Sequence, residues 1–104
     1  MANDIRVVNV PITLDKPRNI VYDLNAFIEL EEIYGSQQEA VKAIQTKGLK
    51  HIRAWLWAGL VHEDKTLTQE QVGSLFSYSD PEVILEISDK ILRAATGNLP
   101  DAKN

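Results

Sequence analysis

Apolar and polar residues alternate over residues 8–14, near the start of the chain. A period of two is typical of a β-strand that has one buried face. Pro11 lies inside this segment and has no N–H to donate, so we expect an edge strand. A turn-forming cluster covers residues 15–19, and residues 20–22 then predict a short return strand. A hairpin of this size is marginally stable in water, and we therefore expect it to pack on the remainder of the chain.

The apolar positions recur every three or four residues from Asn25 onward, which predicts helices. The first helix has its cap at Asp23 or Asn25 and stops at Gly35, with acidic residues opposite its apolar stripe. Ser36 and Glu39 have the spacing of a capping box, so they predict the start of a second, short helix. The expected buried positions of these two helices are Ala26, Phe27, Leu30, Ile33, Tyr34, Ala40, Val41 and Ile44.

Three further helices complete the pattern. The third, over residues 49–62, is the most apolar part of the chain, because Arg53 is its only charge between residues 52 and 61. Thr68 and Gln71 form a capping box for a short fourth helix. The fifth helix has Asp80 as its cap and ends at Gly97 and Pro100. Its expected buried face consists of Ile84, Ile87, Ile91 and Ala94 or Ala95.

The order of these elements, a hairpin and then about five short helices, predicts an α+β fold that is mostly helical. Residues 1–104 are expected to form one domain, with the hairpin over 1–23, the helical bundle over 24–97 and a flexible tail over 98–104. The composition agrees, since 44% hydrophobic and 25% charged residues are ordinary proportions for a globular domain. We find neither a signal peptide nor a run of roughly 18 apolar residues, and the chain has no Cys. These features favour a cytoplasmic protein.

The histidines are the first candidates for metal ligands. His51 and His62 lie near one helical face but about 16 Å apart along the axis, so they cannot both lie about 2 Å from one ion. His62, Glu63 and Asp64 form a local cluster, which we interpret as a solvated loop because hard-ion sites gather more oxygen ligands. We therefore expect no metal.

Catalytic residues are equally sparse. The sequence has no Cys, no Ser in a nucleophile elbow and no glycine-rich phosphate loop. Glu29, Glu31 and Glu32 fall on the face of their helix that is expected to be exposed, where carboxylates can do little acid–base work. We expect neither an enzyme nor a cofactor.

A small helix-turn-helix regulator is an alternative. Two helices meet at Gly48, and positive charge gathers there on Lys42, Lys47, Lys50, His51 and Arg53. The formal net charge of −4 disfavours broad binding to phosphate backbones. Residues 55–61 of the second helix are also mostly apolar, whereas a helix that reads base edges in a DNA groove needs polar side chains. We therefore expect no nucleic-acid partner.

Trp57 is the leading candidate for partner binding. Packing of the third helix through Ile52, Leu56 and Gly59 places Trp57 and Val61 on another side of it. A large aromatic residue among charges is either part of a second buried face or an exposed anchor for a partner. Both interpretations stay open. The candidate partner-binding residues are Trp57, Val61, Arg53, Phe76 and Tyr78.

Several segments in a fixed order carry a resemblance to a known family. They are IRAWLWAGL (52–60), HED (62–64) and LTQEQVG (67–73), preceded by YDLNA (22–26) and YG (34–35). Over roughly residues 18–95 the chain resembles the tail assembly chaperones of long-tailed bacteriophages and gene transfer agents.

The resemblance implies a non-catalytic protein that binds the tape measure protein and helps to load tail tube subunits around it. It also implies a location in the bacterial host cytoplasm and absence from the mature virion. Neither a membrane nor a nucleic acid is an expected partner, and formation of a homo-oligomer stays open. A structural head–tail connector is a further alternative. No contact residue carries over from the family, so the candidates above rest on the helical faces alone.

Overall fold

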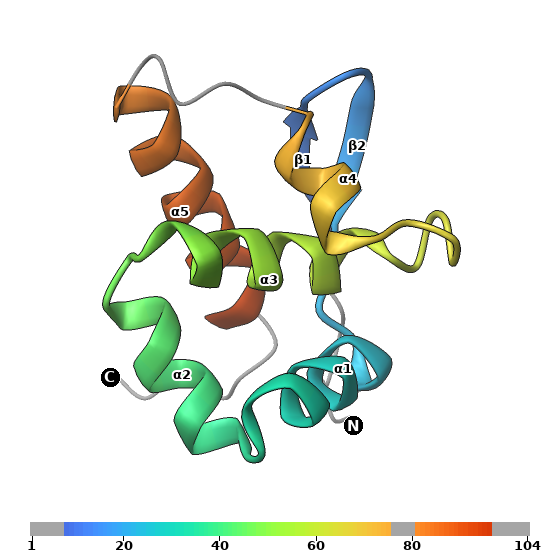
Figure 1. Cartoon of the computed structure of the whole chain (residues 1–104). Helices are drawn as coiled ribbons and strands as arrows, with labels where there is room; N and C mark the ends of the chain where they lie inside the picture. Colours follow the sequence, from blue (N-terminus) through green and yellow to red (C-terminus); the bar gives the residue numbers. More distant parts are fainter. Residues whose placement is uncertain (1–7, 76–80, 97–104) are drawn as a thin grey trace, which may run out of the picture.

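In the computed structural model, residues 8–75 and 81–96 are described, and they form a two-stranded hairpin and five helices (Figure 1). The elements are β1 (Val10–Thr13), β2 (Pro17–Ile20), α1 (Leu24–Tyr34), α2 (Gln37–Gln45), α3 (Leu49–Leu60), α4 (Gln69–Gly73) and α5 (Pro81–Thr96). The predicted α+β, mostly helical architecture is confirmed. The predicted tail over residues 98–104, the cap Asp80 and the stops Gly97 and Pro100 lie outside the described residues.

The hairpin is antiparallel, and its register pairs Val10 with Ile20 and Pro11 with Asn19. β1 is an edge strand in the described sheet, as Pro11 predicts. The expected turn over residues 15–19 is too long, because β2 already begins at Pro17. Arg18 causes the difference: its side chain is 7% exposed and makes two hydrogen bonds to Asp15, so the chain can pair directly after a short turn.

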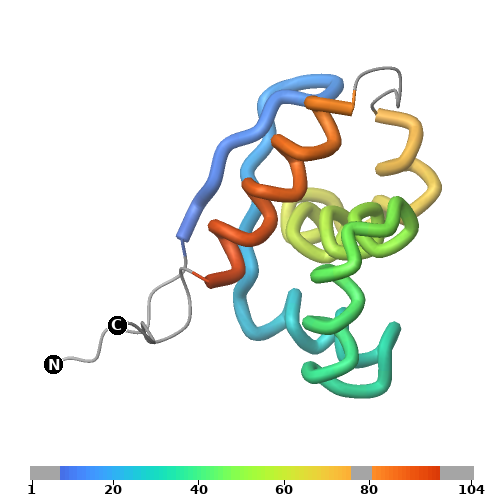
Figure 2. Tube along the Cα trace, turned by 90° about the vertical axis from the view of Figure 1, so that its left-hand side faces the viewer, coloured from blue at the N-terminus to red at the C-terminus, as the bar shows by residue number. Residues whose placement is uncertain are grey.

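α3 lies at the centre of the fold. α1 and α2 lie on one side of it, while the hairpin, α4 and most of α5 lie on the other (Figures 1 and 2). Seven of the twelve residues of α3 are buried. Trp55, the largest fully buried side chain, donates its indole N–H to the Ala40 carbonyl of α2 at 3.1 Å. The Tyr22 hydroxyl donates to the Trp55 carbonyl at 2.6 Å, so α3 is hydrogen-bonded both to α2 and to the segment between β2 and α1.

Gly59 lets the hairpin approach α3 closely. The Val21 N–H donates to the Gly59 carbonyl at 2.9 Å. A Cβ at Gly59 would lie 2.7 Å from Cγ2 of Ile20 and 3.0 Å from the Tyr22 ring, closer than such atoms pack. The absence of a side chain at this position is therefore a packing requirement.

The expected caps are present. Asp23 accepts from the Ala26 N–H, Ser36 accepts from the Glu39 N–H, and Gly35 is left-handed with φ +92°. The capping box of Thr68 and Gln71 is complete in both directions. The buried face predicted for α5 is confirmed, from Ile84 through Ala95.

Two predicted core positions are wrong. Ile33 is 40% exposed and Val41 is 44% exposed. α1 and α2 contribute narrow stripes to the core, consisting of Ala26, Leu30, Ala40 and Ile44, so the wider apolar stripe read from the sequence extends into solvent. The other large aliphatic side chains exposed on the helices are Leu24, Ile28, Leu49 and Leu85.

Candidate functional site: the α1–α3 cleft

Arg53, Trp57 and Val61 form a row at spacings of four residues along α3 and its C-terminal cap, and all three are half-buried. α4 and the loop before it lie over part of this row. The Trp57 indole N–H donates to the Leu67 carbonyl at 2.7 Å. A Cβ at Gly73 of α4 would lie 3.0 Å from Cδ of Arg53, so the Arg53 side chain lies directly against α4.

Trp57 therefore combines the two interpretations that the sequence left open. Its ring packs at the edge of the core and its N–H fastens the α3–α4 loop, yet part of the ring stays accessible. Arg53 is unusual in another respect: its Nε is buried and has no hydrogen-bond acceptor among the described residues. Phe76 and Tyr78, the remaining candidates, lie outside the described residues.

The accessible parts of Trp57 and Val61 line a cleft between α1 and α3 with a volume of about 170 Å³. Ala26 and Ala58 contribute apolar surface, and charged or polar side chains surround them. The polar lining residues are Asp23, Asn25, Glu29, His62 and Lys65. Ligand pockets for metabolites usually measure about 300–1,000 Å³, so this cleft accommodates a single protruding side chain.

The loop after α3 holds the outer edge of β2, a role that the sequence did not indicate. His62 Nε2 donates to the Asn19 carbonyl at 3.0 Å, and the Asn19 N–H donates to Glu63 Oε2 at 3.0 Å. Arg18 Nη1 also lies 3.7 Å from Glu63 Oε1. His62 and Glu63 are exposed, as expected for a solvated loop, but they also occupy both backbone groups of Asn19. No local sequence pattern indicates these contacts, because Asn19 and its two partners are more than 40 positions apart.

Two carboxylates near this loop have a lowered pKa. The hydrogen bonds from the Arg18 guanidinium lower the pKa of Asp15, and the side-chain and backbone hydrogen bonds of Thr66 lower that of Asp64. Both groups are therefore held as acceptors within the turn and the loop that frame β2.

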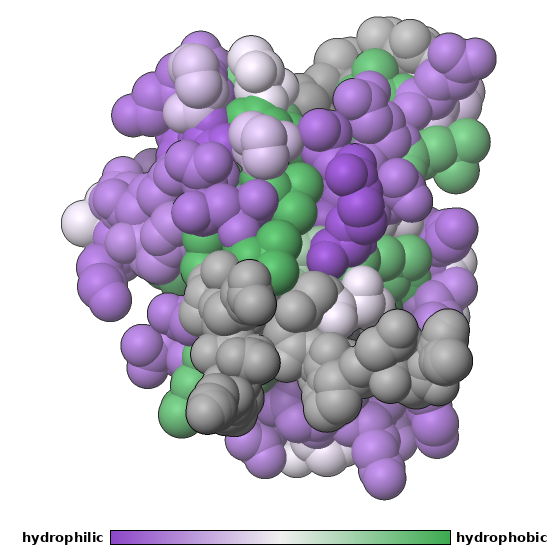
Figure 3. Space-filling model, turned by 180° about the vertical axis from the view of Figure 1, so that it is seen from behind, coloured by the Kyte–Doolittle hydropathy of each residue, from purple (hydrophilic) through white to green (hydrophobic). Residues whose placement is uncertain are grey.

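The other edge of the hairpin is also covered. A groove of about 450 Å³ between β1 and α5 is lined by Ile12, Val83, Ile87 and other residues. Lys90 of α5 reaches across it and donates to the Pro11 carbonyl at 3.1 Å. The view from behind shows hydrophobic side chains as a strip between polar flanks (Figure 3). Since Pro11 has no N–H and its carbonyl is engaged, the middle of β1 is a poor template for an added strand.

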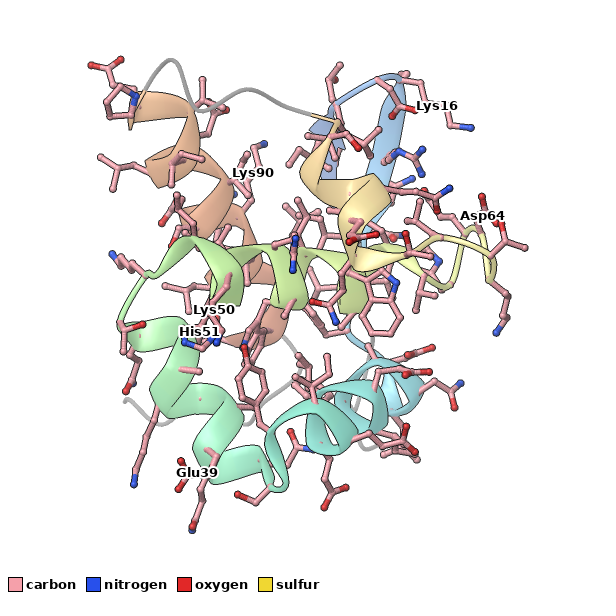
Figure 4. The ribbon with its side chains drawn as sticks, in the orientation of Figure 1. Lys16, Glu39, Lys50, His51, Asp64 and Lys90 are labelled. Carbon is pink, nitrogen blue, oxygen red and sulfur yellow. The ribbon has the colours of Figure 1, made fainter. Side chains whose placement is uncertain are left out.

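The two histidines lie at opposite ends of α3. His51 Nδ1 forms a hydrogen bond of 2.7 Å with the Tyr34 hydroxyl, and burial raises the pKa of Tyr34. Figure 4 shows His51 beside Lys50 above α2, and Asp64 at the far end of the molecule. In residues 8–75 and 81–96, no three His, Cys, Asp or Glu side chains gather in a way that could hold a metal ion.

The basic residues around Gly48 do not line an open helix face. Lys42 pairs with Glu39 at 3.7 Å, and Lys47 adopts a left-handed conformation in the turn. α3, which would be the recognition helix, has its middle buried under α2, α5 and the hairpin. Only its first turn presents Leu49 and Lys50 to solvent, which is little surface for reading base edges.

No protein-family model, curated protein or solved structure matches this chain. Among the described helices, none has both the length and the apolar character needed to cross a membrane.

Proposed function

We propose that this protein is a phage or prophage tail assembly chaperone, which binds the tape measure protein and promotes assembly of the tail tube without catalysis. The observation that carries this function is the ordered set of segments 52–60, 62–64 and 67–73, which resemble that family. In the fold these segments are consecutive parts of one unit: α3, the loop that holds β2, and α4.

The α1–α3 cleft is consistent with a protein partner. It is small, it has an apolar floor at Trp57 and Val61, and it has a charged rim that includes Glu29 and Lys65. Such a site suits one anchoring side chain of a larger partner. A tape measure protein is long and helical, and its apolar faces would aggregate if they stayed bare during assembly. Shielding these faces in the host cytoplasm requires binding alone.

Coexpression with fragments of the tape measure protein encoded by the same genome tests this function. We expect one fragment or more to copurify with the full chain and to lose solubility without it. The finished tail, analysed by mass spectrometry, should lack the chaperone. If the protein stays in purified tails at fixed stoichiometry, it is a structural component such as a connector. Failure of every tape measure fragment to bind would contradict the chaperone function.

The regulator alternative has its own test. Gel-shift at about physiological salt should show only non-specific binding to DNA, roughly micromolar or weaker. Sequence-specific DNA binding that is lost in Lys50→Glu would contradict the chaperone function and support the regulator function.

A further inference from the structure

The outer face of α1, defined here as Leu24, Ile28, Glu31 and Glu32, points away from the buried Ala26 and Leu30. Leu24 is 75% exposed and Ile28 is 42% exposed. They are four residues apart, so they form a short apolar stripe. Glu31 and Glu32 are exposed, and the helical period places one on each side of that stripe.

The acidic charge of the protein is concentrated around this face. Between residues 19 and 41 the sequence has five acidic residues and no Lys, Arg or His. The whole chain has 15 acidic and 11 basic residues, so the remaining parts carry ten acidic and eleven basic ones. The net negative charge therefore belongs to α1 and the start of α2.

Folding accounts for Asp23, which caps α1, but not for the three glutamates of this helix. Among the described residues, Glu29, Glu31 and Glu32 make no ion pair, whereas Glu39 pairs with Lys42. Glu31 and Glu32 also lie in the last turn of α1, where the helix dipole disfavours negative charge, and α1 has no basic residue there. An exposed aliphatic pair and uncompensated acids on one face both disfavour the free protein.

We propose that the outer face of α1 binds a partner helix that has an apolar stripe flanked by Lys or Arg. The aliphatic pair would cover the apolar stripe of that helix, and Glu31 and Glu32 would pair with its basic residues on either side. A nucleic acid or a second copy of the same face is repelled by the acids. This binding mode deepens the proposed function, on which it rests, by specifying the chemistry of the tape measure segment.

Binding of two kinds of probe to the full chain tests this surface. The first is a set of overlapping tape measure peptides. The second is a pair of designed helical peptides with the same leucine stripe, flanked by Lys in one and by Glu in the other. Calorimetry at low and at high salt measures the affinity. The variants are Glu31→Lys/Glu32→Lys and Leu24→Ser/Ile28→Ser, and single substitutions on α5, Asp89→Asn and Leu85→Ser, are the controls.

We expect tape measure binding to be confined to segments with a basic-flanked apolar stripe, and the Lys-flanked peptide to bind more tightly than the Glu-flanked one. Each double variant on α1 should weaken binding about tenfold or more, and the charge variant should also reduce its salt dependence. The α5 controls should change the affinity less than about twofold.

The outcomes separate this inference from the chaperone function. If tape measure segments bind with unchanged affinity to both α1 variants, the α1 surface is wrong and the chaperone function stands. If no tape measure segment binds but the Lys-flanked peptide binds and depends on α1, the surface stands and the chaperone function is wrong. Equal binding of the two designed peptides would overturn the proposed charge complementarity.

Discussion

α3 and α1 pack against each other, but their side chains are arranged in opposite ways. In α3, seven of twelve residues are buried, and Trp55 and Gly59 make specific contacts with α2 and the hairpin. In α1, two of eleven residues are buried, while an aliphatic pair and acids that make no ion pair within residues 8–75 and 81–96 face solvent. Folding therefore explains the sequence of α3, whereas the outer face of α1 needs another explanation.

Contacts within the fold also account for the hairpin, as they do for α3. Its β2 edge is occupied by His62 and Glu63 at Asn19, and its β1 edge by Lys90 at Pro11. Engaged edges of this kind protect a sheet against association through its backbone. The surface that we propose for a partner is therefore an exposed helix face, that of α1, and not an edge of the sheet.

The largest difference in stability should appear between an alanine substitution of Trp55 in α3 and one of Leu24 in α1. Trp55→Ala deletes a side chain that is 2% exposed and removes its hydrogen bond to the Ala40 carbonyl, so we expect a loss of about 3–5 kcal/mol in the free energy of unfolding. Leu24→Ala, at a position that is 75% exposed, should stay within about 0.5 kcal/mol of the parent. Urea denaturation measures both. A similar loss in the two variants would mean that α1 is not a free face.

Gly59 gives the next largest effect. Gly59→Ala places a Cβ 2.7 Å from Ile20 and 3.0 Å from Tyr22, both of which are buried, and we expect a loss of about 1–3 kcal/mol. Gly73→Ala is the matched control, because its nearest neighbour is the flexible side chain of Arg53 at 3.0 Å. The control should lose less stability in the same denaturation experiment. The reverse order would show that the hairpin can move away from α3.

Substitution of Trp57 should cause a loss of stability between those of Trp55→Ala and Leu24→Ala. Trp57→Phe keeps an aromatic ring and removes the hydrogen bond to the Leu67 carbonyl, which should cost about 0.5–1.5 kcal/mol of stability. Thermal denaturation measures this loss, and partner binding of the folded variant shows what the accessible part of the ring adds. An unchanged melting temperature would mean that the loop before α4 is not held by Trp57.

Periodicity and caps predict most of this fold, because they depend on neighbours within one or two helical turns. The capping box at Thr68 and the core face of α5 are both recovered in this way. The errors at Ile33 and Val41 arise where the width of the buried stripe depends on how helices pack. The hydrogen bonds of His62 and Glu63 with the backbone of Asn19 join residues that are far apart in sequence, so no local pattern indicates them.

The candidate site is less predictable than the fold for the same reason. The row of Arg53, Trp57 and Val61 follows from the helical period of α3, and Trp57 and Val61 do line one cleft. The loop that partly covers Trp57 could not be placed from the sequence. Conversely, the exposed Leu24 and Ile28 beside acidic residues were available as a signal, since Leu24 and Ile28 fall outside the stripe that predicts the core.

A smaller effect on stability comes from Asp15, and it should change with pH only in acidic solution. The hydrogen bonds from Arg18 lower the pKa of Asp15 below its unfolded value of about 3.9. A carboxylate whose pKa is lower in the folded state adds stability above the unfolded pKa, and this contribution is lost as the pH falls through the folded value. We expect the urea midpoints of the parent and Asp15→Asn to differ near neutral pH and to converge below about pH 4. A constant difference would contradict the link between Asp15 and Arg18.

The smallest expected effects have opposite signs in two helices. α5 follows the usual arrangement, with Glu82 in its first turn and Arg93 in its last, whereas the last turn of α1 has Glu31 and Glu32 and no basic residue. Because charges near a helix end interact with its dipole by about 0.3–1 kcal/mol, Glu31→Lys/Glu32→Lys should raise the free energy of unfolding slightly. Arg93→Glu should lower it, through the dipole and through loss of the 3.9 Å contact with Asp89.

Denaturation at low and at high salt distinguishes the electrostatic origin of these effects, since screening should shrink both. If the α1 charge variant is more stable than the parent and binds its partner less well, the acids of α1 reduce stability in favour of binding. If the variant is instead less stable, Glu31 and Glu32 support the fold, and the distinction between α1 and α3 fails at those two positions.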